Sequence, residues 1–414
     1  MRRGIDSTEA WLTALAALLI LSVAFGSPHI ASTGLKTIAA DLGGHRSVPS
    51  GASALAWLGT GVGGLMMGLI AEKIGVRFTA MFGAAMVATG LVISSGGATW
   101  QLYLGHGVFI GLLGNAGINA PLYVYVTRWF EKRRGAAIAL IASGQYAAGA
   151  IWPPIFERAI AAYGWQQTML GFGALIAVAV VPLAGIFLKR PPEASGAAGT
   201  GGGKGITSET LGVKPAVVFS LLCVASFLCC IAMAMPQAHI IALCGDLGFL
   251  PGRGAAMLSL LLTCAFFSRQ FWGWLSDRIG GLFTLLICSG AQAIAMLGFL
   301  VTQDEAGLFA VATFFGLGFS GLIPAYIFTA RQLFPANEAS WRMPMLLLTG
   351  TAGMAFGGWS AGVIHDYYGF YQPAFATGLA ANVVNFLILA SLVGFWWRGR
   401  QTRVHTMDAR PAGG

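Results

Sequence analysis

Long apolar runs separated by short polar segments occupy almost the whole chain. A helix that crosses a membrane needs about 20 mostly apolar residues, and this template predicts two series of six spans. They lie near 11–35, 51–71, 78–98, 102–127, 135–157 and 167–189, and near 214–243, 252–276, 281–302, 306–330, 342–364 and 373–397. The pattern therefore predicts an all-α membrane protein with twelve transmembrane helices.

One long polar, glycine-rich stretch interrupts this pattern between the sixth and seventh spans. Such a composition is typical of a linker. We therefore predict an N-terminal six-helix half at 1–189, a cytoplasmic linker at 190–213, a C-terminal six-helix half at 214–397 and a cytoplasmic tail at 398–414.

The two predicted halves share an internal repeat. Three short motifs recur at a single offset of 205 residues: Gly68–Gly75 as Gly273–Gly280, Asp41-Leu42-Gly43 as Asp246-Leu247-Gly248, and Tyr163-Gly164 as Tyr368-Gly369. A common offset indicates two structural repeats of parallel topology, an arrangement that occurs in transporter folds.

Charged residues are scarce and unevenly distributed. Only 9% of the residues are charged and 56% are apolar, whereas soluble domains are roughly one quarter charged, so lipid surrounds most of the predicted surface. Nineteen of the 24 lysines and arginines fall in tails and loops on one side of the spans. This asymmetry places both termini in the cytoplasm, at a cell membrane that we expect to be a bacterial inner membrane. It also explains the net charge of +9 without nucleic acid binding.

Two repeated loops on the cytoplasmic side have charged residues next to glycines. Gly68, Glu72 and Arg77 belong to the first loop, and Asp277 and Arg278 belong to the second. A carboxylate and a cation at helix ends can pair with a neighbouring helix terminus and hold one state of a rocking protein closed. We predict that these residues gate the cytoplasmic side; the alternative is a solvated turn.

One arginine lies within a predicted span. Arg269 is in the eighth apolar segment, about two turns before Asp277, where burial of a guanidinium costs roughly 2.5 to 3.5 kcal/mol. All 15 acidic residues lie at span ends, in loops or in tails, so none is available at mid-span to neutralise it. We predict that Arg269 binds the carboxylate of a substrate; the alternative is that it caps helix carbonyls.

Other polar side chains within the spans are candidates for lining a substrate cavity. Asn119 and Tyr123 lie four residues apart on one face of the fourth span, Gln145 lies in the fifth span, and Tyr326 lies in the tenth. Hydrogen bonding between helices explains these four residues equally well.

A histidine in the first span is a candidate for both substrate binding and proton coupling. His29 follows Pro28 in a polar stretch of an otherwise apolar helix, and an imidazole can carry a proton near neutral pH. The six cysteines show no metal-ligand spacing, so we expect neither a metal site nor a cofactor.

The two-half architecture and the loop from Gly68 to Arg77 resemble the major facilitator superfamily. Four segments resemble, within it, the monocarboxylate porters and their oxalate/formate antiporter relatives: Trp129–Gly135, Pro28-His29 before Lys36, Ser268–Gly273 and Ala361–Gly369. The resemblance implies a carrier in which an arginine of the eighth span binds the substrate carboxylate, and Arg269 stands at that position.

The chain departs from those relatives at positions that concern coupling. Proton-coupled animal members have an aspartate one turn before the arginine and a lysine after the first-span proline, where this chain has Ala265 and His29. The oxalate exchanger has a second cation in its eleventh span, whereas residues 343–364 contain no lysine or arginine. A single fixed cation favours a monoanion.

These features predict a secondary active transporter of small monocarboxylates such as lactate or pyruvate, coupled to protons and working by alternating access as a monomer. Its partners would be a small carboxylate anion, a proton and the lipid bilayer. An oxalate/formate-like anion exchanger and a carboxylate sensor that does not transport remain alternatives. No span pairs a nucleophile with a base or has a metal-ligand cluster, so we do not expect an enzyme.

Overall fold

The computed structural model describes residues 5–131, 133–188 and 213–408, and within these ranges the chain is helical, with no β-strand. The predicted linker at 190–213 lies, apart from Val213, outside the described residues. The elements of the N-terminal half are α1 (Thr8–Ala24), α2 (Ser27–Thr33), α3 (Leu35–Asp41), α4 (Ser47–Ile74), α5 (Val76–Ser94), α6 (Thr99–Leu104), the π-helix η1 (Gly105–Asn115), α7 (Ala116–Thr127), α8 (Arg134–Ala142), α9 (Gly144–Leu175), the π-helix η2 (Ile176–Val180) and α10 (Val181–Phe187). Those of the C-terminal half are α11 (Pro215–Asp246), α12 (Arg253–Ile279), α13 (Gly281–Val301), α14 (Glu305–Phe319), α15 (Leu322–Leu333), α16 (Ala336–Tyr368) and α17 (Gln372–Asp408).

Ten helical stretches of the described chain are long and apolar enough to cross a membrane. One of them, Ala136–Phe187, has 52 residues and bends at Gly164, where a φ of 80° and a ψ of 163° leave the helical region. It therefore provides two spans. A further span is α16, whose 33 residues pack against α11 and α4. The described residues thus contain the twelve spans that the apolar pattern predicts.

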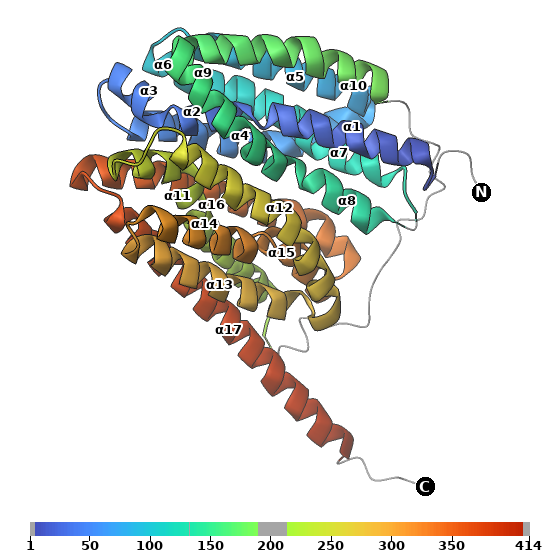
Figure 1. Ribbon diagram of the computed structural model, residues 1–414. Helices are drawn as coiled ribbons and strands as arrows, with labels where there is room; N and C mark the ends of the chain where they lie inside the picture. The colour runs from blue at the N-terminus through green and yellow to red at the C-terminus, as the bar shows by residue number, and fades with distance from the viewer. Residues whose placement is uncertain (1–4, 132, 189–212, 409–414) are drawn as a thin grey trace.

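The last helix is longer than the apolar pattern indicates. α17 continues without a break to Asp408 and projects from the bundle (Figure 1). The segment predicted as a tail from residue 398 therefore begins as an extension of the twelfth span.

The repeat in the sequence has a counterpart in the backbone. Positive φ angles between 76° and 101° occur at three pairs of glycines separated by the repeat offset: Gly43 and Gly248, Gly75 and Gly280, and Gly164 and Gly369. Residues with a Cβ rarely adopt this conformation. The three repeated motifs therefore form corresponding turns in the two halves.

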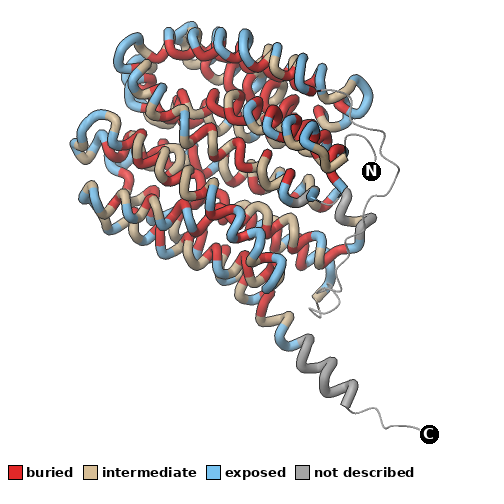
Figure 2. Tube along the Cα trace, turned by 45° about the vertical axis from the view of Figure 1, so that its right-hand side comes forward, coloured by how far each residue is buried: buried red, intermediate tan, exposed pale blue. Residues whose placement is uncertain are grey.

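The two halves form two layers, each with its own buried apolar core (Figure 1). Buried residues are concentrated inside the layers and between them (Figure 2). Large apolar side chains also cover the outside: Leu69, Val178, Phe267 and Ile294 are between 63% and 76% exposed. A surface of this kind would favour association in water, whereas in a bilayer it contacts lipid.

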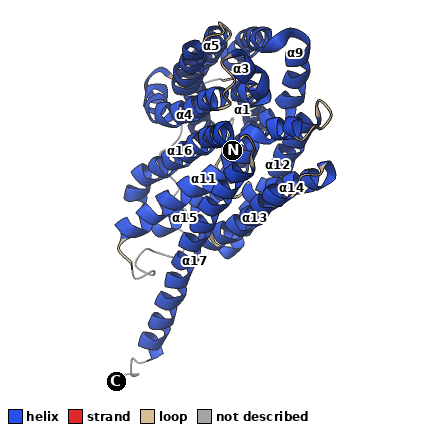
Figure 3. Cartoon of the chain, turned by 90° about the vertical axis from the view of Figure 1, so that its left-hand side faces the viewer, coloured by secondary structure: helices blue, strands red, loops and turns tan. Residues whose placement is uncertain are grey.

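Two helix crossings join the layers, α4 with α16 and α9 with α12. Figure 3 shows them from the side, with α16 next to α4 and α12 below α9. A Cβ on Gly61 would clash with Thr351 at the first crossing, and a Cβ on Gly149 would clash with Leu262 at the second. The absence of side chains at these glycines allows the helices of the two halves to approach closely.

The contact between the halves differs at the two ends of the bundle. We call the end with the α3–α4, α11–α12 and α16–α17 connections the latch end, and the end with the α4–α5 and α12–α13 turns the linker end. Towards the linker end, a Cβ on Gly68 or Gly273 would meet nothing within 4 Å. At these two positions, α4 and α12 therefore do not make the close contacts seen at mid-height.

Candidate functional site

The centre of the candidate site is the guanidinium of Arg269, halfway along α12 and only 9% exposed. Its Nη1 donates a hydrogen bond to the Ala142 carbonyl at 2.6 Å, and its Nη2 donates to the Tyr146 hydroxyl at 3.1 Å. The guanidinium carbon also lies 4.4 Å from the centre of the Tyr146 ring. These partners belong to the N-terminal half, so Arg269 bridges the two layers.

The charge of Arg269 is not neutralised within the described chain. No carboxylate of the described residues forms an ion pair with it, and its Nε is buried without a hydrogen-bond partner. Arginine remains cationic in proteins, and a buried charge is costly unless it is paired. The hydrogen bonds and the cation–π contact compensate only part of that cost. The site is therefore suited to an anion.

Two further predicted residues contact each other, and a third lies near this arginine. Asn119 and Tyr123 project from one face of α7, and the Gln145 side chain at the start of α9 donates to the Asn119 carbonyl oxygen at 3.4 Å. The hydroxyl of Tyr123 lies within electrostatic range of the Arg269 charge. Asn119 and Gln145 are thus joined within the N-terminal half, and Tyr123 shares the α7 face of Asn119.

Tyr326 occupies a different environment. Its side chain is 1% exposed, and its hydroxyl donates to the Asn385 side chain at 2.9 Å. Asn385 in turn donates to Ser289 at 2.8 Å, and Asn382 donates to the Ser289 carbonyl at 2.9 Å. The Tyr326 hydroxyl therefore belongs to a polar network within the C-terminal half, and not to the group of side chains around Arg269.

His29 lies against α9, about one turn nearer the latch end than Tyr146. Its ring approaches Gly149 of α9, and a Cβ added at Gly149 would come to 3.0 Å from the His29 Nε2 and would clash with Leu262. Gly149 follows Tyr146 by about one turn of the same helix. The ring of His29 makes no side-chain hydrogen bond to another described residue.

The predicted gating residues make no ion pair between the halves in the part of the chain that the structure describes. Glu72, Arg77, Asp277 and Arg278 are all exposed at the linker end. The guanidinium of Arg278 lies 4.1 Å over the ring of Trp274, one turn earlier in its own helix. In this conformation these residues do not make the contact between the halves that the sequence predicts.

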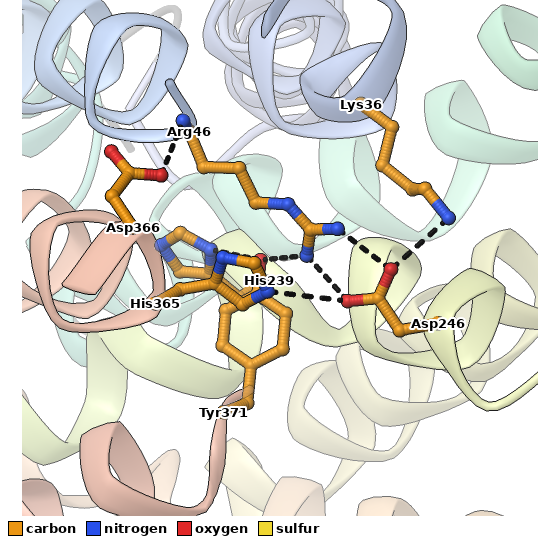
Figure 4. Close-up of polar contacts among 7 residues, drawn as sticks. All are labelled: Lys36, Arg46, His239, Asp246, His365, Asp366 and Tyr371. Carbon is orange, nitrogen blue, oxygen red and sulfur yellow. Dashed lines mark hydrogen bonds and ion pairs between the residues drawn. The ribbon is translucent and has the colours of Figure 1, made fainter. Parts of the chain in front are cut away.

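At the opposite end, a network of ionic contacts that the sequence did not predict joins the halves. We call it the latch cluster; it consists of Lys36, Arg46, His239, Asp246, His365, Asp366 and Tyr371 (Figure 4). Arg46 forms a bidentate pair with Asp246, with distances of 2.5 and 2.6 Å, and Lys36 lies 3.1 Å from the same carboxylate. Asp246 ends α11 in the C-terminal half, whereas both cations belong to the N-terminal half.

The second carboxylate of the latch cluster binds the beginning of α4. Asp366 accepts hydrogen bonds from the backbone amides of Arg46 and Ser47 at 2.7 and 2.9 Å. A carboxylate at a helix N-terminus satisfies free amides and interacts favourably with the helix dipole. This contact therefore fastens α16 to α4.

Tyr371 and His239 lie behind the ion pair. Arg46 donates to the Tyr371 hydroxyl at 2.9 Å, and that hydroxyl lies 3.0 Å from the His239 Nδ1. The His239 Nε2 lies 2.8 Å from the Gly358 carbonyl, which can only accept, so Nε2 carries the proton and Nδ1 accepts from Tyr371. Burial raises the pKa of the Tyr371 hydroxyl, which therefore stays protonated as a donor.

One feature of the sequence repeat points to the latch cluster. Asp246 is the counterpart of Asp41 at the repeat offset, but the two carboxylates have different partners. Asp41 accepts from the indole of Trp165 at 2.7 Å within its own half, whereas Asp246 binds the other half. Within the described residues, no group of three or more His, Cys, Asp and Glu side chains could hold a metal ion.

The comparisons with known proteins agree with this architecture. The model of the Major Facilitator Superfamily matches residues 11–339. The chain is 23% identical to the MFS-type transporter pynF of Aspergillus niger over 339 residues, which are 80% of this chain and 76% of that protein. It is 25% identical to monocarboxylate transporter 13 of Rattus norvegicus over 342 residues, which are 79% of this chain and 76% of that protein.

A solved structure gives independent support for the fold. A bacterial homologue of the human lysosomal transporter Spinster, in an inward-facing and occupied conformation, superposes with a TM-score of 0.67 at 15% identity. The match covers 96% of this chain and 98% of that one. Since the family model spans most of the sequence and the twelve-span, two-half fold agrees with it, the chain belongs to the Major Facilitator Superfamily, a family of membrane transporters.

Proposed function

We propose that this protein is a secondary transporter of small monocarboxylates that works by alternating access. The observation that supports this most is Arg269, a buried cation at the contact between the halves that no described carboxylate neutralises. A carboxylate substrate supplies the missing charge. The similarity to a monocarboxylate transporter supports the same substrate class.

The proposed orientation places the linker end in the cytoplasm, because most lysines and arginines belong to loops and tails on that side. The latch end then faces the exterior and is closed, while the exposed residues of the repeated loops mark an open cytoplasmic gate. On this proposal the structure represents the inward-facing state of a rocking carrier.

Substrate binding begins at the edge of Arg269 that has no partner. A carboxylate takes the free Nε–H together with one Nη–H as a bidentate pair. Because the Nη groups now bind Ala142 and Tyr146 of the other half, the arriving anion changes a contact between the halves. An anion that binds more tightly to one conformation than to the other shifts the equilibrium towards the first.

We propose a proton as the coupling ion and His29 as its carrier. An imidazole titrates near neutral pH, and one proton balances the charge of one monocarboxylate. Replacement of His29 with alanine should abolish uptake driven by a proton gradient, whereas exchange of labelled for unlabelled substrate should persist. Gradient-driven uptake that is unchanged in His29→Ala would remove His29 from this role.

Uptake into proteoliposomes tests the proposed function. Labelled lactate, pyruvate, formate and oxalate are offered with and without an inward proton gradient. We expect a monocarboxylate to accumulate when the gradient is imposed. Exchange whose rate does not depend on the proton gradient would indicate an anion exchanger, and binding without flux would indicate a sensor. The absence of both binding and flux for all four acids would contradict the carboxylate assignment.

A further inference from the structure

The latch cluster must break whenever the exterior side opens. Lys36 and Arg46 belong to the N-terminal half, while Asp246 and Asp366 belong to the C-terminal half. In an alternating-access cycle, on which this inference rests, the halves separate at this end. The strength of these contacts therefore sets how readily the outward-facing state forms.

Asp246 is the hub of the cluster and has three basic neighbours. Besides Arg46 and Lys36, the Nε2 of His365 lies 3.6 Å from its carboxylate. The His365 side chain is 11% exposed, and both of its ring nitrogens are buried without a hydrogen-bond partner. His365 is thus a titratable group that approaches the ion pair without contributing a hydrogen bond to it (Figure 4).

His365 has different charged neighbours when the latch is closed and when it is open. His365 and Asp246 lie on α16 and α11, which pack together in one half and move together. The two cations leave with the other half when the latch opens. A proton on His365 then has Asp246 as its counter-ion, whereas in the closed latch Arg46 and Lys36 already occupy that carboxylate and repel the added charge.

We propose that His365 and Asp246 form an extracellular proton-binding site, and that a proton bound there favours the open latch. The sign follows from linkage: the state that binds the proton more tightly gains population as the pH falls. A tenfold difference in proton affinity between the two states changes the ratio of open to closed molecules by up to about tenfold. Imidazole is the side chain whose titration falls between pH 5 and 8.

The other charged and titratable groups of the cluster do not replace His365 in this role. Asp366 is held by two backbone amides, and Tyr371 stays protonated because burial raises its pKa. His239 is held in one neutral tautomer by Tyr371 and the Gly358 carbonyl. His45 lies 3.9 Å from Asp366, but its side chain is 70% exposed and it approaches no other carboxylate of the cluster.

Distances between spin labels test the proposal without a transport assay. The labels are attached through ketone-bearing amino acids at Ala40 and Tyr367, two exposed positions on opposite halves of the latch end, which leaves the native cysteines in place. The purified full chain is measured in lipid nanodiscs at pH 5.5 and pH 8. We expect the ratio of long to short distances to increase between threefold and tenfold at the lower pH.

Three variants make this measurement decisive. His365→Gln should reduce the pH response to less than twofold, while His45→Gln should retain it. Asp246→Asn should give long distances at both pH values, because it removes the partner of Arg46 and Lys36, and this result shows that the label pair reports latch opening. A pH response that is as large in His365→Gln as in the wild type, or its absence from the wild type, would overturn the proposal.

The result is separable from the proposed function. If the spin-label distances do not change with pH but the protein transports carboxylate, only the proposed proton site is overturned. A latch that responds to pH in a protein that moves no carboxylate would overturn only the transport proposal. If His365→Gln does not fold, His365→Asn provides the same loss of the titratable ring with the same expected outcome.

Discussion

Two arginines of this protein lie between its halves in opposite electrostatic surroundings. Arg46 has a bidentate carboxylate partner, whereas Arg269 has only a carbonyl, a hydroxyl and an aromatic ring. An ion pair that is complete in one state stabilises that state, while an unpaired cation provides a binding site. The first arginine therefore fastens the latch end, and the second is available to a substrate.

The hydroxyl of Tyr146 should contribute to carboxylate affinity because it fixes the plane of the Arg269 guanidinium. Tyr146→Phe keeps the ring and removes that hydrogen bond, which is worth about 1 kcal/mol. We expect about fivefold weaker affinity, measured as the substrate concentration at half-maximal uptake. Tyr146→Ala should weaken it further, because the cation–π contact is lost as well. Equal affinities in Tyr146→Phe and wild type would show that the hydroxyl has no such role.

The two cations of the latch cluster should differ in importance. Arg46 is 13% exposed and makes two bonds to Asp246 and one to Tyr371, whereas Lys36 is 47% exposed and makes a single contact. We expect Arg46→Ala to favour the open latch by about 2 kcal/mol and Lys36→Ala by less than about 1 kcal/mol. The Ala40 and Tyr367 label pair measures both; a larger effect for Lys36→Ala would contradict this ranking.

At the scale of helices, the close crossing of α9 and α12 depends on a residue without a side chain. Gly149 faces Leu262 and His29, so a larger residue requires either the Leu262 side chain or the two helices to shift. Gly149→Val should therefore disfavour the state with a closed latch end, and spin-label distances should lengthen. Gly171→Val is a control beyond the Gly164 bend of α9, because a Cβ there meets nothing within 4 Å. Similar distances in the two variants would show that the crossing tolerates a side chain.

The helices themselves were predictable because lipid imposes a simple rule on length and polarity. Twelve apolar segments indicated twelve spans, and the repeat offset indicated two similar halves. The bend at Gly164 and the extension of α17 to Asp408 refine this picture. The extension could not be predicted because its residues are polar, and a helix that leaves the membrane has no apolar pattern to mark it.

The two sets of functional contacts were not equally predictable. Arg269 is conspicuous in the sequence because a charge within an apolar segment is rare, and the spacing of Asn119 and Tyr123 placed them on one face. For the latch cluster, the sequence gives only the recurrence of Asp41 as Asp246, which does not identify the partner of Asp246. The central pair of the cluster joins residues 200 positions apart, and Arg46 and Asp246 by themselves are ordinary charges at the ends of spans.

At the scale of the whole molecule, the halves are joined by close helix crossings at mid-height and by the latch cluster at one end, while the charged residues of the repeated loops at the linker end are exposed. A carrier with a site at mid-height can expose that site to one side at a time only if the two ends close alternately. The latch cluster and the repeated loops occupy the two ends where such closure is needed. Arg269 lies between these two ends, where a substrate site must be for alternating access.

Transport by Arg269→Ala, compared with Arg253→Ala, tests whether Arg269 binds the carboxylate. Both arginines lie on α12, but Arg253 starts the helix at the surface, where its side chain is 50% exposed and pairs with Glu305 at 3.2 Å. With both variants shown to be folded and reconstituted at equal density, carboxylate uptake into proteoliposomes should fall at least about 30-fold in Arg269→Ala, equivalent to about 2 kcal/mol. Uptake in Arg253→Ala should stay within about twofold of the wild type. Wild-type uptake in Arg269→Ala would contradict the assignment of this arginine as the carboxylate-binding residue.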